Sequence, residues 1–189
     1  MVRMRGIFFF PLSFAVLLLL AGPSRAGAGA APARSQARPQ SLPQVDDCAK
    51  GVSAEQVLAR VNAMRAQRQY CGPKPFAAVA PLSWDARLQA SAQAYADELS
   101  LLDKLTHIDQ RGQGLRERVL ERGYVFRQVA ENLAGGPQYL DEVMAGWLGS
   151  EGHCENLMEP RFQDIGMACV AGPGELERYW VMHLGRKAK

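Results

Sequence analysis

Two histidines and one glutamate are the residues of this chain whose types could do chemistry together. His107 lies in the sequence Leu-Thr-His-Ile-Asp, Glu131 in Ala-Glu-Asn-Leu-Ala-Gly-Gly, and His153 in Ser-Glu-Gly-His-Cys-Glu-Asn. Imidazole and carboxylate groups bind divalent metals and also transfer protons. Because the three residues lie in separate segments, they form a site only if the fold brings these segments together.

Three roles are open to this group. A zinc site needs three or four ligands at about 2.0–2.3 Å, and the two histidines with Glu131 would meet that number. The chain has no His-x-x-x-His or Cys-x-x-Cys spacing that would point to a metal. Glu131 could instead act as a general base, or hold each imidazole by a hydrogen bond. Bound zinc or another divalent cation is therefore a conditional prediction, with His107 and His153 as its ligands.

Other polar residues have more ordinary interpretations. His183 alternates with Met182 and Leu184, so we expect it to be packed or hydrogen-bonded within a sheet. Ser150 lacks the Gly-x-Ser-x-Gly surroundings of a hydrolase nucleophile. Asn132 is expected to serve structure, because asparagine readily hydrogen-bonds to the backbone of turns.

The pattern of apolar residues predicts the elements that must position these side chains. Helical spacing indicates helices over about residues 54–69, 84–102, 115–121 and 137–148. β-prone runs indicate strands over residues 124–129, 164–170 and 178–184, of which the last two form a hairpin. Ser53 and Ser83 are expected N-caps, and Gly123 the C′ residue of the third helix. Helices on both sides of a small antiparallel sheet make an α/β fold, an α-β-α sandwich.

The N-terminal sequence indicates export. Residues 1–28 combine arginines, an almost unbroken run of about 14 apolar residues and the small-residue sequence Ala26-Gly-Ala28, as a secretory signal peptide does. The run is shorter than the ~20 residues that span a bilayer, so we expect cleavage and no transmembrane anchor afterwards. We expect an Ala/Pro-rich linker at 29–47, one domain at 48–186 and a basic tail at 187–189. The chain would be secreted or periplasmic.

The charge balance argues against a nucleic-acid partner. Removal of residues 1–28 takes away three arginines and no acidic residue, so that 22 basic residues become 19, equal to the 19 acidic ones. A chain without net positive charge has no overall field to attract nucleic acid.

Four cysteines fit an oxidising compartment and predict two disulfides. Three pairings are possible, and we favour the two local ones, Cys48–Cys71 and Cys154–Cys169. The second pair would close a loop of about 15 residues and stabilise the fold by ~3 kcal/mol, because it lowers the entropy of the unfolded chain.

A fixed order of motifs runs over roughly residues 57–185. The motifs are Leu-Ala-Arg-Val-Asn-Ala-Met-Arg at 58–65, Pro-Leu-Ser-Trp-Asp-Ala-Arg-Leu at 81–88, Ala-Glu-Asn-Leu-Ala-Gly at 130–135, Trp-Leu-Gly-Ser-Glu-Gly-His-Cys-Glu-Asn at 147–156 and Tyr-Trp-Val-Met-His-Leu-Gly at 179–185. Together with His107 they resemble the CAP superfamily, also called the SCP-like extracellular domain. The Ser-x-Gly-His-x-x-Asn form is similar to its compact bacterial branch.

The resemblance implies a cleft with two histidines and two acidic residues, which in some members bind a divalent cation. By motif, His107 and Glu131 take two of these positions, and His153 resembles the second histidine of bacterial-type members. Ser150 stands where eukaryotic members have a glutamate, with Glu151 next to it. The candidate ligand-cleft residues are His107, Glu131, Asn132, Ser150, Glu151, His153 and Asn156.

Two functions remain in competition. We favour a non-enzymatic extracellular binding module whose ligand is a lipid, a cell-envelope component or a protein. The alternative is a metal-assisted hydrolase, with His107 and His153 as ligands and Glu131 as the general base. The incomplete set of acidic residues harms catalysis more than binding, so the first function leads.

Overall fold

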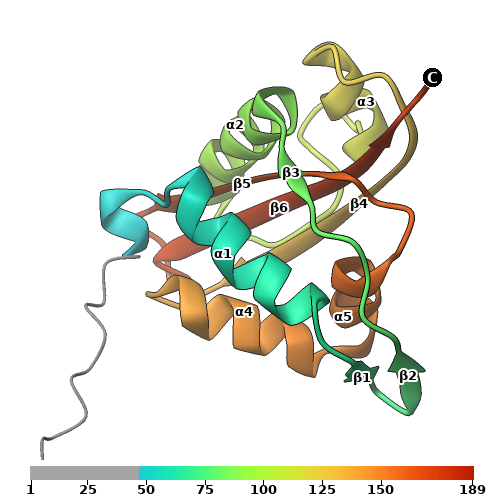
Figure 1. Cartoon of the computed structure of the whole chain (residues 1–189). Coiled ribbons are helices and arrows are strands. Elements are labelled where there is room, and N and C mark those ends of the chain that lie inside the picture. The colour runs from blue at the N-terminus through green and yellow to red at the C-terminus, as the bar shows by residue number, and fades with distance from the viewer. Residues whose placement is uncertain (1–46) are drawn as a thin grey trace, which may run out of the picture. The chain divides into compact units, whose positions relative to one another are not determined.

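A four-stranded sheet with helices on both faces forms the body of the protein, as the computed structural model shows for residues 47–189 (Figure 1). The elements in chain order are η1 (Cys48–Lys50), α1 (Ala54–Arg65), β1 (Gln69–Cys71), β2 (Lys74–Phe76), β3 (Ser83–Trp84), α2 (Ala86–Leu102), α3 (Leu115–Glu121), β4 (Phe126–Gly135), α4 (Leu140–Gly149), α5 (Glu151–Met158), β5 (Asp164–Ala171) and β6 (Arg178–Lys187). The predicted signal peptide and residues 29–46 of the predicted linker lie outside the described residues. Within residues 47–189, no helix has the length and apolar character needed to span a bilayer.

The sheet has the strand order β3-β5-β6-β4, so β4 is an edge strand. β5 and β6 form the predicted antiparallel hairpin, and β4 also pairs with β6 in the antiparallel direction. The short β3 pairs with β5 in parallel through Ser83 and Trp84. The α/β sandwich with a small, mainly antiparallel sheet is confirmed.

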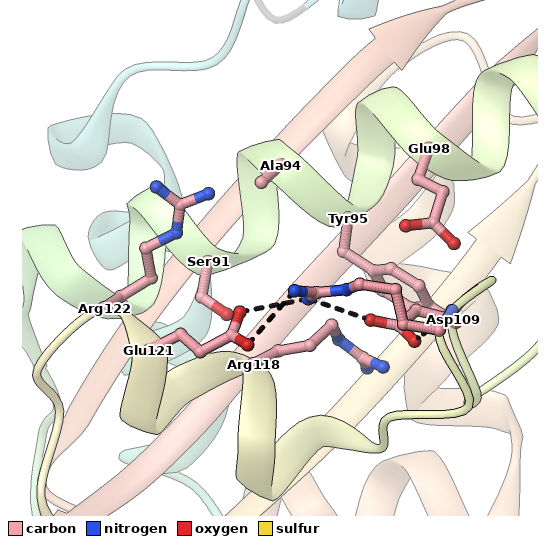
Figure 2. A pocket seen from close by; sticks show the side chains of 9 residues that line it. Ser91, Ala94, Tyr95, Glu98, Asp109, Arg118, Glu121 and Arg122 are labelled. Carbon is pink, nitrogen blue, oxygen red and sulfur yellow. Dashed lines mark hydrogen bonds and ion pairs between the residues drawn. The ribbon is translucent and has the colours of Figure 1, made fainter.

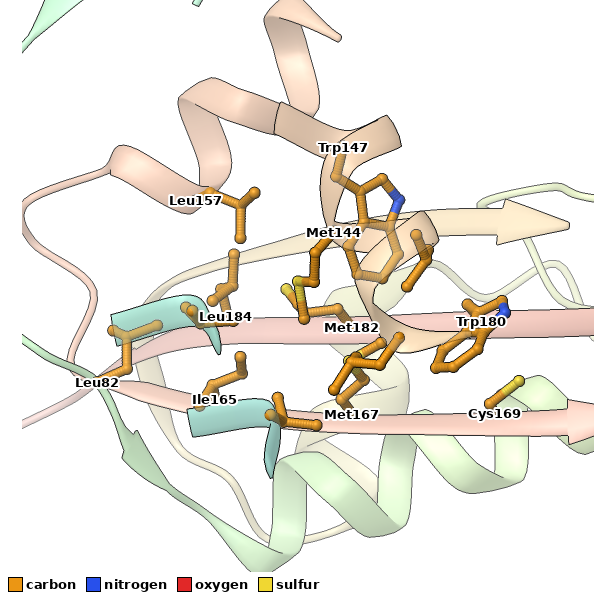
Figure 3. Close-up of a cluster of buried hydrophobic side chains, with 14 of the residues drawn as sticks. Leu82, Met144, Trp147, Leu157, Ile165, Met167, Cys169, Trp180, Met182 and Leu184 are labelled. Atoms are coloured by element: carbon orange, nitrogen blue, oxygen red, sulfur yellow. The ribbon is translucent and has the colours of Figure 1, made fainter. Parts of the chain in front are cut away.

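Each face of the sheet buries its own apolar cluster. Residues of α1, α4 and α5 pack on one face, where Trp147 and Trp180 are at most 2% exposed (Figure 3). On the other face, Tyr95 and Leu99 of α2 pack against Tyr179 of β6. Side chains alternate across a strand, so neighbouring residues of β4 and β6 point to opposite layers.

Local signals explain where several helices begin and end. Ser53 is the N-cap of α1, as expected, and it forms a capping box with Gln56. Gly123 has a φ of 76° just after α3, a left-handed conformation that favours glycine, which confirms its predicted C′ position. α2 is capped by Asp85 instead of Ser83, because residues 83–84 are held as strand β3.

The second half of the chain departs from the predicted boundaries. α4 begins at Leu140, and Pro137 lies before it, where its carbonyl accepts a hydrogen bond from Trp180 Nε1. Ser150 has an extended backbone (φ −103°, ψ 123°), which ends α4, and an unpredicted helix α5 follows. α1 ends at Arg65, earlier than periodicity suggests.

The disulfide prediction was wrong. Cys48 pairs with Cys169, and Cys71 pairs with Cys154, over separations of 121 and 83 residues. The first bond joins η1 to β5 and the second joins the β1–β2 hairpin to α5. Short sequence separation was the wrong criterion, because the fold places these distant elements side by side.

The described fold extends one residue beyond each predicted end of the domain. Asp47 already belongs to the fold, since its side chain caps η1 and its backbone pairs with Tyr139. At the other end, β6 includes Lys187, whose ammonium group lies 3.1 Å from Asp164 and 3.2 Å from Asp85.

Candidate functional site

Glu131 lies in the middle of edge strand β4, directly opposite His183 of β6. The sequence suggested a turn here, but the turn begins only after Gly135. Cross-strand neighbours point to the same face of a sheet, so the Glu131 carboxylate and the His183 ring meet. Glu131 is 8% exposed and His183 is fully buried.

Three side chains hold both oxygens of the Glu131 carboxylate. His107 Nδ1 lies 2.7 Å from Oε1, and His183 Nε2 lies 2.9 Å from Oε2. Arg118 Nη2 donates to Oε2 over 2.6 Å. Glu131 therefore does lie between two imidazoles, but the second one is His183 and not the expected His153.

Arg118 is the site residue that sequence reasoning missed. It is 6% exposed, and its Nη1 also donates to the backbone carbonyls of His107 and Gln113. Its guanidinium carbon lies 3.5 Å from the centroid of the Tyr95 ring. One arginine thus ties α3, the loop that carries His107 and strand β4 together. A charged residue in a short polar helix gives no signal of such burial.

The environment of Glu131 keeps it ionised. Burial by itself would raise its pKa, but the hydrogen bonds from His107 and His183 and the charge of Arg118 lower the pKa to about 2. Such a carboxylate is a weak base at neutral pH. Its chemistry is that of an anchor which accepts hydrogen bonds.

The three histidines have different protonation tendencies. The hydrogen bond with Glu131 raises the pKa of His107, whose side chain is 63% exposed. Burial lowers the pKa of His183, which therefore donates to Glu131 as a neutral ring. Burial and then the charge of His107 lower the pKa of His153. Within the described residues no hydrogen bond joins the His107 and His153 rings, so the charge of His107 acts on His153 only through space.

Two asparagines position α5 and hence His153. Asn132, next to Glu131 but on the opposite face of β4, donates to the His153 carbonyl and accepts from Asn156 Nδ2. Asn132 is fully buried. Its expected structural role fits this geometry, and its buried side chain bears on the candidate cleft through the position of α5.

Ser150 and Glu151 lie away from the Glu131 network. Glu151 starts α5 and its carboxylate lies 3.2 Å from Lys74 Nζ, on the β1–β2 hairpin. Ser150 supplies the carbonyl that accepts from Cys154 at the break between α4 and α5. The described contacts therefore join His107, Glu131, His183 and Arg118 into one network. Asn132, Asn156 and the backbone of His153 are hydrogen-bonded to one another on the α5 side of β4.

The family follows from comparison with known proteins. The model of the CAP family, described as the cysteine-rich secretory protein family, matches residues 58–184. The chain belongs to the CAP family. The matched range contains the whole Glu131 network and both asparagines.

The curated relatives of this CAP domain are themselves described as uncharacterized. It is similar to the uncharacterized protein YkwD of Bacillus subtilis (strain 168), with 29% identity over 110 residues, which cover 58% of this chain and 40% of the relative. It is also similar to the uncharacterized membrane protein YlbC of the same organism, with 29% identity over 118 residues, or 61% of this chain and 31% of the relative. The chain thus spans less than half the length of these relatives.

Two solved bacterial structures have the same fold as this CAP domain. An extracellular protein with an SCP domain from Bacillus anthracis matches with a TM-score of 0.58 and 21% identity, over 70% of this chain and 40% of that chain. An outer surface protein from Borrelia burgdorferi matches with a TM-score of 0.57 and 20% identity, over 73% of this chain and 98% of that chain.

The three predicted metal ligands do not form a metal-binding group within the described residues. Within residues 47–189, no group of three or more His, Cys, Asp or Glu residues is arranged to hold one. Glu131, the third ligand that the sequence suggested, already uses both oxygens for hydrogen bonds.

A polar pocket of about 50 Å³ adjoins the network on the side of α2 and α3 (Figure 2). Arg118 lines it, and Arg111 bridges Asp109 and Glu121 across it. Ser91 Oγ and Arg118 Nε are buried there without a hydrogen-bond partner within the described chain. Arg118 lines this pocket and also donates to Glu131, so the pocket gives polar surroundings to the partner of Glu131.

Proposed function

We propose that this CAP domain is an extracellular binding module that contacts its ligand through His107 and His153. The relatives with solved structures include an extracellular SCP-domain protein, and two disulfides suit an oxidising space. The ligand classes are a lipid, a component of the cell envelope or a protein.

The single observation that carries this proposal is the engagement of Glu131. A general base must accept a proton from water, and a metal ligand must offer a lone pair. Glu131 offers neither freely, because His107, His183 and Arg118 occupy its oxygens and lower its pKa to about 2. What remains for a ligand is the outer nitrogen of the half-exposed His107, together with His153.

The orientation of His107 supports a binding role. Its Nδ1–H donates to the fixed Glu131 carboxylate, so Nε2 points away from the anchor and is available to a ligand. Because Glu131 raises the pKa of His107, this nitrogen also carries a proton over a wider pH range. A protonated His107 donates to an acidic or carbonyl oxygen of the ligand.

A binding panel tests the proposal. Purified phospholipids, peptidoglycan fragments and immobilised envelope proteins are offered to the native domain and to H107A/H153A. We expect at least one probe to bind natively and to lose about tenfold or more affinity in the double variant, the equivalent of one or two hydrogen bonds to charged groups. K50A/R68A, which alters two exposed basic residues elsewhere, serves as the control.

Two outcomes would overturn the proposal. One is that no probe loses affinity in H107A/H153A. The other is stoichiometric zinc in the purified protein together with a hydrolytic activity that chelation abolishes, which would establish the alternative metal-assisted hydrolase.

A further inference from the structure

One end of the sheet brings together two basic segments that are distant in sequence. In the register of β4 and β6, Phe126 lies opposite Lys187 and Gln128 opposite Arg186, and Ala188 N donates to the Val125 carbonyl. The C-terminal sequence Arg-Lys-Ala-Lys is therefore not an isolated tail. It lies along the start of β4.

Helix α3 extends the same surface. The Arg116 guanidinium carbon lies 4.9 Å from the centroid of the Phe126 ring, and α3 leads directly through Gly123 into β4. The α3 helix, the start of β4 and the end of β6 thus lie together at one end of the molecule, here called the basic end (Figure 1). Its members are Arg116, Leu120, Arg122, Val125, Arg127, Arg186 and Lys189.

The positive charge of the basic end is not neutralised within the described chain. Its four arginines and Lys189 make no ion pair with any residue in 47–189, whereas the neighbouring Lys187 pairs with Asp85 and Asp164. Of the two acidic residues of α3, Glu121 pairs with Arg111, and Glu117 accepts a hydrogen bond from the backbone of Gly114 and keeps its charge. One carboxylate therefore stands against five unpaired basic groups. The near-zero charge of the mature chain hides this local excess.

Two large aliphatic side chains are exposed among these charges. Leu120 is 49% exposed and Val125 is 61% exposed. Exposed aliphatic side chains at the same end as unpaired basic residues suit an anionic membrane surface, where the apolar groups enter the interface and the basic groups meet headgroups. A soluble acidic polymer would use the charges and leave the aliphatic groups in water.

We propose that the basic end binds the surface of a membrane that contains anionic lipids, with Leu120 and Val125 inserted between the headgroups. None of these residues contacts Glu131 or His107, so the proposal does not depend on the function of that site. Each basic residue near such a surface strengthens binding about fivefold, and the attraction falls as salt rises.

Sedimentation with vesicles tests this proposal. A chain that begins at residue 41 contains the described core and both disulfides, and it omits the apolar run near the N-terminus, which could bind lipid by itself. We expect binding to vesicles of phosphatidylcholine mixed with phosphatidylglycerol, and none to phosphatidylcholine alone. Charge reversal in R122E/R127E should weaken binding by more than about tenfold, and L120S/V125S should weaken it without any change of charge.

Matched variants make the result decisive. K50E/R68E makes the same charge change at exposed residues outside the basic end and should bind nearly as the native protein does. Circular dichroism checks that each variant is folded. The proposal is overturned if anionic vesicles do not bind, or if K50E/R68E loses as much as R122E/R127E. It is also overturned in favour of a soluble polyanion if L120S/V125S binds unchanged and polyglutamate releases the protein.

Discussion

At the scale of single residues, the site depends on one buried carboxylate with three partners. Glu131 is fixed by the cross-strand neighbour His183, by Arg118 from α3 and by His107 from the preceding loop. A buried charge is stable only when it is paired and hydrogen-bonded, and this one is both. The same contacts that stabilise the ion fix the direction of the exposed His107 ring.

Removal of the charge at this position should destabilise the domain. In E131Q the buried Arg118 loses its partner, so we expect the free energy of unfolding to fall by about 3 kcal/mol, as measured in urea. The control is D141N, because Asp141 forms an exposed ion pair with Arg60. This substitution should change the free energy of unfolding by less than about 1 kcal/mol. A loss in E131Q as small as in the control would contradict the anchoring role.

The same carboxylate predicts part of the pH dependence of stability. Its pKa in the folded chain, about 2, lies below the ordinary value of 4.5. The ionised form therefore stabilises the fold fully above about pH 4.5, and this contribution is lost as the pH falls toward 2. Native protein should lose more unfolding free energy than E131Q over this acid range, which urea unfolding at a series of pH values measures.

Residue types predicted half of this site. The exposed His107 and the Glu131 motif stand out in the sequence, and the structure joins them. Arg118 could not be found in this way, because an arginine in a charged helix is ordinarily solvated. His183 was correctly expected to be a packed sheet residue, but its partner depends on strand register, which the sequence does not specify.

At the scale of elements, the disulfides attach peripheral pieces to the sandwich. Cys48–Cys169 holds the start of the domain on β5, and Cys71–Cys154 holds the β1–β2 hairpin on α5. The second bond lies one residue after His153, so it restrains the helix that carries this ring.

Peptide mapping checks this pairing directly. Non-reducing digestion and mass spectrometry should yield linked peptides that contain Cys48 with Cys169 and Cys71 with Cys154. The variant C71A/C154A should lose about 2–5 kcal/mol of stability, because its unfolded chain is released from a long loop. Linked peptides for Cys48–Cys71 would contradict the described fold.

The close approach of α2 to the sheet makes a second prediction at this scale. A Cβ atom on Gly166 of β5 would lie 2.1 Å from the backbone nitrogen of Gln89 in α2. G166A must push the helix away and should cost about 3 kcal/mol or more in urea unfolding. Gly146, in the exposed part of α4, has no atom near its added Cβ, so G146A should be neutral or slightly stabilising. Equal effects of the two substitutions would contradict this packing.

Elements with strong local signals were predictable, and elements defined by their neighbours were not. The capping box at Ser53 and the left-handed Gly123 mark helix ends in the sequence itself. The break at Ser150 has no proline and no left-handed glycine, so α5 was missed. β4 was predicted too short because its second half contains the polar pair Glu131-Asn132, which only its buried partners make compatible with a strand.

At the scale of the whole molecule, the site lies where the two helical layers meet at an edge strand. His107 comes from the loop after α2, on one face of the sheet, and His153 comes from α5, on the other face. Successive residues of β4 serve the two sides, Glu131 toward His107 and Asn132 toward α5. The arrangement therefore requires the complete sandwich, which no local sequence signal reports.

The titration of the histidines by NMR tests the central claim most directly, because the chain contains only three of them. If Glu131 anchors His107, then His107 titrates above the ordinary value of 6.5, His153 titrates below it, and His183 stays neutral at neutral pH. The protonated form of His107 then stabilises the fold below pH 6.5 and loses this effect as the pH rises through its raised pKa. In E131Q the pKa of His107 should fall. A pKa of His107 at or below 6.5 in the native protein, or a pKa that does not change in E131Q, would contradict the account.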